Sequence, residues 1–340
     1  MGVPARNSGQ EGGGDSAPVS SPPMHTQPRL TAYLLLTASM TLVGSYVALS
    51  KPLVAALPVL ALAFLRFAIG AVAMVPWTAR ASGEAPLTGT EHRWLFLMSF
   101  FGNFLFSVCM LSGIQRTTAT AAGVILATLP AVVALLSRVF LREALTPRTL
   151  LAIALAVAGI VLLQFAKGDG DATTQQQWLG NLLMFGAVIC EASYVILGKR
   201  LAPLRSPLRV SALINLWGLA LMTPLGLWQL ARFEVATLTP GLWLLLVFYS
   251  LAASLFAVWL WMTGLRHVPA NHAGVFTVAL PISATAIGVL ALGEAFTLLH
   301  ALALLLAASG VVLIASGRPA PALQPVPGQV AGRRPPPLRG

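Results

Sequence analysis

Between residues 31 and 316, long apolar runs alternate with short polar breaks. Several breaks combine Gly with Ser, Asp or Pro, as in Ser82-Gly83, Gly168-Asp169-Gly170 and Thr239-Pro240-Gly241, and such clusters favour turns. Each run is close to the roughly 20 residues that a helix needs to cross a bilayer. Because the runs are continuous rather than alternating, membrane-spanning strands are disfavoured. The runs lie at about 31–50, 57–78, 94–112, 119–140, 149–165, 178–198, 208–230, 242–262, 272–292 and 298–316. The pattern predicts an all-α integral membrane protein with ten transmembrane helices.

The composition also favours a protein whose outer surface faces lipid. Hydrophobic residues make up 57% of the 340 residues, charged residues make up 9%, and the mean hydropathy is +0.81. Soluble domains carry about 25% charged residues. A net charge of +11 on a soluble domain would suggest nucleic-acid binding. Here the basic residues stand between the apolar runs, where they determine membrane topology, so we expect the lipid bilayer and no nucleic acid as a partner.

The distribution of Lys and Arg predicts the orientation in the membrane. Of the 21 basic residues, Arg66 lies inside a run, and 16 lie on the side that carries the N-terminus. The opposite side holds only Lys51, Arg116, Lys167 and Arg232. Since cytoplasmic loops carry the excess of basic residues, both termini are predicted to be cytoplasmic, in a protein of the cell membrane. The Gly-, Ser- and Pro-rich segments 1–29 and 317–340 are predicted to be disordered cytoplasmic tails.

The sequence repeats itself after about 150 residues. A shift of 151 places the segment 113–163 on 264–314 without a gap, and a shift of 148 places Ser45-Tyr46-Val47 on Ser193-Tyr194-Val195. The paired identities in the longer match include Gly113/Gly264, Ala119/Ala270, Gly123/Gly274, Pro130/Pro281, Glu143/Glu294, Thr146/Thr297 and Gly159/Gly310. Chance similarity between Leu- and Ala-rich helices is the alternative. The preferred interpretation is two units, 31–165 and 178–316, with five spans each.

An odd number of spans per unit predicts that the two units cross the membrane in opposite directions. The loop charges agree, because Arg138, Arg142 and Arg148 flank an inner loop of the first unit. Their counterparts in the second unit, Val289, Gly293 and Leu299, are uncharged. Inverted repeats are typical of secondary transporters, whose substrate path lies at the interface between the repeats.

The repeated pattern resembles a known family. The order Gly-Leu, Ala-x-x-x-Gly, Leu-Pro, Leu-Gly-Glu-Ala and Thr at 264–297, with a variant at 113–146, is similar to the EamA repeat of the drug/metabolite transporter superfamily. The resemblance covers about 31–316. It implies a ten-helix exporter of amino acids, other metabolites or drug-like compounds, driven by an ion gradient, and it leaves the substrate undefined.

Two ionisable residues lie well inside the predicted spans, where charge is costly and marks functional sites. Arg66 lies in the second span and Glu191 in the inner half of the sixth. Arg66 is a candidate ligand for an anion or carboxylate, and Glu191 is a candidate site for a proton or another coupling cation. The structural alternatives are an Arg66–Glu191 ion pair, or Arg66 bonded to backbone carbonyls. An acid at position 191 departs from the small or aromatic residue that the family resemblance implies.

Weaker candidates are spread over other spans. Asn103 and Asn215 offer amides for substrate binding or for bonds between helices. Tyr46, Tyr194 and Trp259 are aromatic candidates for a cavity lining, with lipid-facing or interfacial positions as the alternative.

Several paired positions in the two units point to helix breaks and packing instead. Pro130 and Pro281 are predicted to interrupt the fourth and ninth helices at matching depth. Glu143 and Glu294 are interpreted as turn or cap residues required by both units. Gly123 and Gly274, each four residues after an alanine, indicate close helix packing.

The sequence favours transport over catalysis. It contains no GxxxxGK[ST] or HExxH motif, so we expect no ATP-driven motor, no metal site, no cofactor and no enzymatic activity. The two cysteines, Cys109 and Cys190, do not form a CxxC pair. The leading hypothesis is a secondary transporter that exports small organic metabolites, amino acids first, by alternating access. Efflux of drugs or toxic compounds, a membrane-embedded enzyme and a passive channel are the alternatives.

Overall fold

The computed structural model describes residues 27–79, 86–141, 145–165, 172–201, 206–235, 238–265 and 274–315, and within these ranges every regular element is a helix. The tails 1–26 and 316–340 and the candidate Glu143 lie outside the described residues. The α-helices are α1 (Gln27–Ala56), α2 (Val59–Thr78), α3 (Gly89–Ser99), α4 (Phe106–Ile114), α5 (Ala119–Leu126), α6 (Leu129–Leu141), α7 (Pro147–Phe165), α8 (Ala172–Leu201), α9 (Pro207–Leu230), α10 (Pro240–Leu251), α11 (Ala257–Leu265), α13 (Ala279–Leu290) and α14 (Leu298–Ala315). Two π-helical segments, η1 (Phe100–Leu105) and η3 (Ala252–Phe256), and one 3₁₀ segment, η4 (Gly274–Val278), complete the elements.

Seven of these helical stretches are long and apolar enough to cross a membrane. They begin at Leu30, Val59, Gly89, Ala119, Gln175, Leu208 and Pro240. Three shorter apolar helices, Pro147–Leu162, Phe276–Leu290 and Leu298–Leu313, occupy the remaining predicted spans. Large apolar side chains such as Val72, Leu244 and Leu305 are exposed on the outside of the bundle. Exposure of such apolar side chains to water is unfavourable, whereas the hydrocarbon core of a bilayer accommodates them.

Four predicted helices differ in detail from continuous α-helical spans. The third begins at Gly89 and passes through η1 into α4, and the eighth passes through η3 in the same way. A π-helical segment inserts an extra residue into the helical turn, and hydropathy does not report it. The fourth helix is divided at Ala127–Thr128, directly before Pro130. The ninth changes from η4 to α13 just before Pro281.

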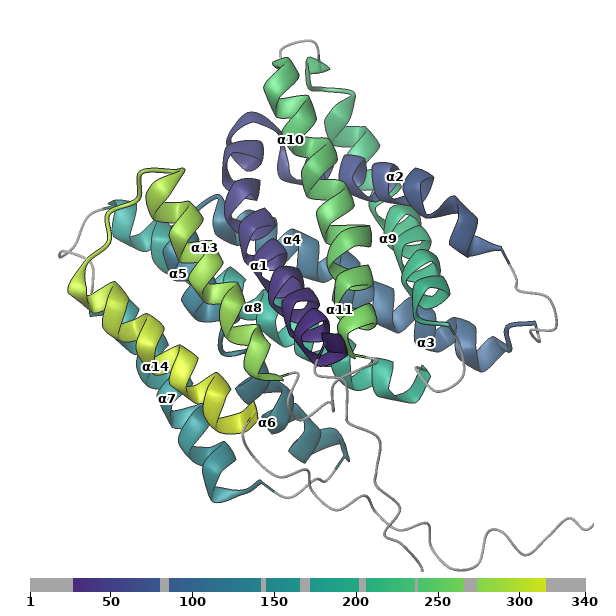
Figure 1. The fold of residues 1–340 in the computed structure, drawn as a ribbon. Coiled ribbons are helices and arrows are strands. Elements are labelled where there is room, and N and C mark those ends of the chain that lie inside the picture. The colour runs from purple at the N-terminus through teal and green to yellow at the C-terminus, as the bar shows by residue number, and fades with distance from the viewer. Residues whose placement is uncertain are drawn as a thin grey trace, which may run out of the picture.

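Helices from the first and second halves of the chain interleave throughout the bundle (Figure 1). At one side α7 packs along α14, and at the other side α2 packs along α9. Between them, α1 packs against α11 and α13, while α8 packs against α4 and α6. A single large apolar cluster fills the middle, with Phe67, Met110 and Ile125 among its fully buried members. The protein core is therefore built jointly by both halves.

Candidate functional site

A group of polar side chains lies within the bundle, and five helices contribute to it. We call it the central cluster and define it as Tyr46 of α1, Arg66 of α2, Ser107 of α4, Glu191 of α8 and Tyr249 of α10. All five elements belong to predicted spans, so these groups are shielded from bulk water on most sides. Polar groups inside a membrane protein usually face an interior path or a partner.

Arg66 is held in place at its guanidinium group by a side chain of another helix. It is 6% exposed, and its Nη1 donates a hydrogen bond of 2.7 Å to Oγ of Ser107. The guanidinium carbon lies 4.9 Å from the ring centre of Phe67 and 5.8 Å from that of Tyr249. Aromatic faces stabilise a cation at such distances. The structure thus differs from both structural alternatives, since Arg66 bonds to a hydroxyl rather than to backbone carbonyls or to Glu191.

Glu191 faces the same region without a direct partner. It lies near enough to Arg66, Tyr46 and Tyr194 for electrostatic interaction. It is half-buried and forms no ion pair or hydrogen bond with the described residues. A carboxylate within a helix bundle but outside an ion pair remains able to exchange a proton or contact a ligand.

The aromatic candidates separate into two groups. The ring of Tyr46 meets that of Tyr249 edge to face, with centroids 5.8 Å apart. Tyr194 packs onto η1, where its ring fills the space beside Gly102. Trp259 is 47% exposed, which favours the lipid-facing alternative for this residue.

The amide candidates join helices of the two halves. Asn103 of η1 donates from Nδ2 to the Ile214 carbonyl at 3.0 Å, and Asn215 of α9 donates to the Phe67 carbonyl at 3.1 Å. Asn215 also accepts a 3.3 Å hydrogen bond from Ser254 of η3. These contacts use the amides for helix packing, which was one of the two alternatives for them.

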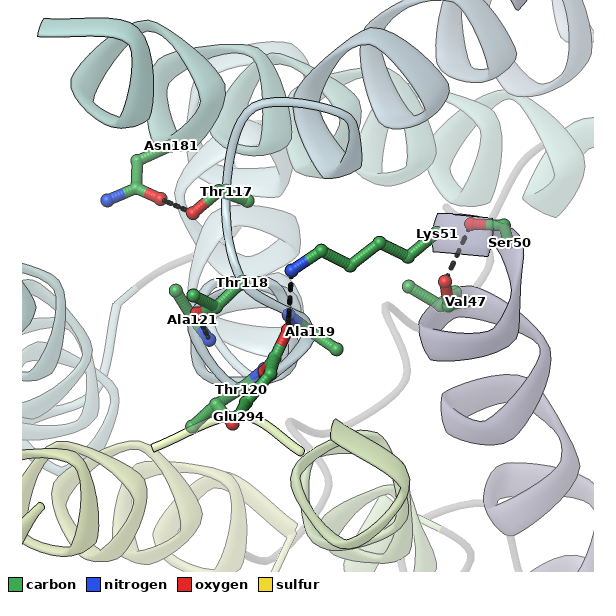
Figure 2. A network of polar contacts seen from close by, with 10 residues as sticks. All are labelled: Val47, Ser50, Lys51, Thr117, Thr118, Ala119, Thr120, Ala121, Asn181 and Glu294. Atoms are coloured by element: carbon green, nitrogen blue, oxygen red, sulfur yellow. Dashed lines mark hydrogen bonds and ion pairs between the residues drawn. The ribbon is translucent and has the colours of Figure 1, made fainter. Parts of the chain in front are cut away.

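Glu294 organises a second polar group, which we call the Glu294 network: Lys51, Ala119, Thr120 and Glu294 (Figure 2). Its Oε1 accepts hydrogen bonds of 2.7 Å from both Lys51 Nζ and the Ala119 amide. Its Oε2 accepts from the amide of Thr120 at 3.0 Å and from the hydroxyl of Thr120 at 3.1 Å. The carboxylate therefore caps the N-terminus of α5, where a negative charge is favourable.

The chain reaches this position by a tight turn after α13. Gly293 has a φ of +67°, which glycine adopts without strain, and the Glu294 amide bonds back to the Gly288 carbonyl at 2.9 Å. Glu294 lies in this turn, outside the helical segments. Burial would raise the pKa of Glu294, but Lys51 and the amides of Thr120 and Ala119 together hold it below the usual value.

One of the paired glycines, Gly123, lies against one of the paired prolines, Pro281. A side chain at Gly123 of α5 would approach Ala284 of α13 to 2.9 Å and the Pro281 carbonyl to 3.2 Å. Pro281 itself is buried on α13, and Pro130 is half-buried near the start of α6. Gly274 begins η4. The fourth and ninth helices therefore meet directly at the small residues.

The sequence analysis did not single out Ser107, Lys51 or Tyr249 as site residues. Lys51 and Glu294 are 243 positions apart, and Arg66 and Ser107 are 41 apart. Only the helix packing brings them together. The one sequence signal that could have indicated the Lys51–Glu294 pair is a basic residue at the end of an apolar run in one half and an acidic residue just after a run in the other half.

The apolar exterior, the seven candidate spans and the buried charged groups define a multi-pass α-helical membrane protein with a polar interior. Residues 30–165 and again 178–316 match the EamA-like transporter family. The chain belongs to this family, within the drug/metabolite transporter superfamily that the sequence pattern resembled.

Relatives support this assignment, and a solved structure supports the fold. The chain is 35% identical to the uncharacterized transporter YetK of Bacillus subtilis (strain 168), over 80% of this chain and 83% of that protein. It is 25% identical to an uncharacterized transporter of Archaeoglobus fulgidus, over 74% of this chain and 86% of that one. A crystal structure with 20% sequence identity matches 84% of this chain and 96% of its own, with a TM-score of 0.56, and it supports the fold alone. The protein is therefore a membrane transporter of the EamA-like family.

Proposed function

We propose that the protein is a secondary active transporter that exports small organic metabolites, amino acids or related compounds, across the cell membrane. The observation that carries the proposal is the central cluster, in which Arg66 and Glu191 face one region without forming an ion pair. Two opposite charges that do not neutralise each other remain available to bind a substrate and a coupling ion, and they come from helices of both halves. Efflux of drugs or toxic compounds by the same route is the second candidate, because the family resemblance also implies export of drug-like compounds.

Matched contacts in the two halves support an inverted repeat of five helices each. Gly70 of α2, in the first half, packs against Ser254 of η3, in the second half. A Cβ added to this glycine would lie 2.7 Å from Oγ of the serine. Gly218 of α9 approaches Asn103 of η1 in the same way, at 3.1 Å from its Cβ. In the repeat, Gly70 corresponds to Gly218 by the shift of 148, and Asn103 corresponds to Ser254 by the shift of 151. The two contacts are therefore equivalent, with the halves exchanged. Ten spans follow when the three shorter apolar helices cross the membrane together with the seven longer stretches.

Alternating access between the two units is the mechanism that such a repeat supports. In the proposal the two units rock about the central cluster and expose it to one side of the membrane at a time. The Glu294 network joins α1 and α5 of the first unit to the turn before α14 of the second. Its contacts break when the units separate at that end of the molecule. The interrupted fourth and ninth helices, at Pro130 and Pro281, provide the bending points.

Glu191 is the coupling group in this proposal, with the proton as the coupling ion. A carboxylate that makes no ion pair can take up a proton from one side of the membrane and release it to the other. The test is Glu191→Gln, which removes the exchangeable proton and keeps the shape. We expect normal expression, intact exchange of substrate across the membrane and loss of transport driven by a pH gradient. Ser193→Ala on the same helix, where the hydroxyl bonds only to the Ile189 carbonyl, is the matched control and keeps both activities.

Two results would contradict the coupling role. Transport by Glu191→Gln with unchanged pH dependence would exclude it. Failure of Glu191→Gln to accumulate, with rescue by an added Arg66→Gln, would show instead that the two charges stabilise the fold jointly.

The transported compound is found by comparing metabolites inside and outside cells with and without overexpression of the chain. We expect a limited set of small organic compounds to increase outside the cells, and we expect Glu191→Gln to abolish the increase. An unchanged metabolite profile across a broad panel would contradict export.

A further inference from the structure

The Arg66 side chain has unused hydrogen-bonding capacity. Nη1 donates to Ser107, whereas Nε has no partner among the described residues although it is completely buried. A buried guanidinium that leaves a donor unsatisfied pays the desolvation cost of that group. The position of the group over two aromatic rings stabilises the charge, but it cannot satisfy an N–H in the plane of the guanidinium.

Tyr249 presents a second unsatisfied donor beside it. This tyrosine is fully buried, and the Arg66 guanidinium lies within reach of its hydroxyl oxygen as a donor, whereas the hydrogen of the hydroxyl finds no acceptor among the described residues. The Arg66 guanidinium lies over the Tyr249 ring, and the ring of Tyr46 packs against the Tyr249 ring edge to face. Tyrosine hydroxyls in protein interiors usually have a partner. Two orphan donors from neighbouring helices at one place indicate an incomplete site.

We propose that Arg66 and Tyr249 form a subsite for the carboxylate of an organic acid substrate. This inference rests on the proposed transport function and specifies the substrate class for the same site. A carboxylate has lone pairs for both orphan donors, and hydrogen bonds between charged groups are the stronger kind. The single fixed cation suits one negative charge, while Phe67, Tyr46 and Tyr249 provide apolar walls for the remainder of the acid.

Ser107 and Glu191 have defined positions around this subsite. Ser107 of α4 holds the guanidinium by its hydrogen bond with Nη1 and leaves Nε uncommitted. Glu191 interacts with Arg66 only at a distance and leaves both orphan donors without a partner. The subsite therefore requires an acceptor that comes from outside the chain.

The test measures thermal unfolding of the purified full-length chain in detergent with added monocarboxylates and their matched amides. Suitable pairs are lactate with lactamide, benzoate with benzamide, and glycine with glycinamide. We expect at least one carboxylate to raise the unfolding temperature while its amide does not. Tyr249→Phe removes one hydrogen bond to the bound acid, so we expect its Kd to rise about tenfold. Tyr33→Phe is the control, because it removes the hydroxyl of an exposed tyrosine. We expect it to leave the Kd unchanged.

Arg66→Lys is the second variant, because it keeps the charge but loses the fork of donors. We expect it to abolish the stabilisation by the carboxylate. Equal stabilisation by acid and amide, unchanged affinity in Tyr249→Phe, or no stabilisation by any carboxylate in the panel would each overturn the subsite. If the compounds exported by cells all lack an acid group, the subsite falls while transport stands. If a carboxylate binds through these residues but nothing is exported, the transport proposal falls while the subsite stands.

Discussion

At the scale of single residues, Glu294 shows how one carboxylate can stabilise three elements. It receives hydrogen bonds from Lys51 of α1 and from two consecutive residues at the start of α5 (Figure 2). Its side chain is 7% exposed, whereas that of Lys51 is 31% exposed. The helix-capping bonds are therefore better shielded from water than the ion pair, and they should contribute more to stability.

We predict that Glu294→Gln lowers the stability of the protein by about 1–2 kcal/mol, since it loses a charged cap. Lys51→Met should cost less, because the carboxylate keeps its three hydrogen bonds from Ala119 and Thr120. Thermal unfolding in detergent compares the two variants directly. A larger loss in Lys51→Met would mean that the ion pair, and not the helix cap, dominates.

The same carboxylate predicts a pH dependence. Because the folded state holds the pKa of Glu294 below its unfolded value, its stabilising effect is present above the unfolded pKa and disappears as the pH falls through the lowered folded pKa. The difference in unfolding temperature between the natural chain and Glu294→Gln should stay constant from pH 7 to about pH 5. It should then shrink at lower pH. A difference that does not change with pH would contradict the charged cap.

The sequence located some of these residues but not their partners. Arg66, Glu191 and Glu294 were identifiable because charge is rare in a chain with 9% charged residues and costly near lipid. Tyr249 and Ser107 are ordinary residues of apolar helices. Their importance depends on which helices pack together and on how each helix is rotated about its axis. These features cannot be predicted from a single sequence.

At the scale of elements, the ranges of the helices followed closely from hydropathy, while their internal irregularities did not. The π-helical segments η1 and η3 have no Pro or other local signal. They coincide with contacts across helices, such as the bond of Asn103 to the Ile214 carbonyl. By contrast, the breaks near Pro130 and Pro281 were predictable, because proline cannot continue the backbone hydrogen bonding of a helix.

The packing of η1 against α8 gives a test at this scale. A Cβ on Gly102 would lie 2.5 Å from the ring of Tyr194, so Gly102→Ala forces the π-helical segment and α8 apart. We predict a loss of about 1–3 kcal/mol in stability. Gly89→Ala is the matched control, since nothing lies within 4 Å of its added Cβ, and its effect should stay within about 0.5 kcal/mol. Equal effects of both substitutions would contradict the close contact.

At the scale of the whole molecule, the interleaving of both halves is the feature with the greatest consequence. Contacts between α2 and α9 and between α7 and α14 join corresponding helices of the proposed units, and α5 packs on α13, which belongs to the span that corresponds to its own (Figure 1). The other major contacts occur as exchanged pairs, with α1 on α13 matched by α8 on α6. A bundle arranged in this way can change shape by tilting one unit against the other around its centre.

The orientation of the molecule is a further prediction at this scale. The excess of Lys and Arg on one side predicts that both termini face the cytoplasm. A reporter enzyme that is active only outside the cytoplasmic membrane, fused after residue 340, should therefore be inactive. The same reporter inserted next to Arg232, in the turn after α9, should be active. High activity at residue 340 would overturn the topology and the opposite orientation of the two units.

In the proposed mechanism, Glu191 couples active transport to the movement of protons. The most direct measurement of this coupling is uptake of an exported compound into inside-out membrane vesicles that carry a pH gradient. We predict accumulation above the outside concentration, loss of accumulation on addition of a protonophore, and exchange without accumulation in Glu191→Gln. A compound that only equilibrates across the vesicle membrane, with or without the gradient, would contradict the account and indicate a passive channel.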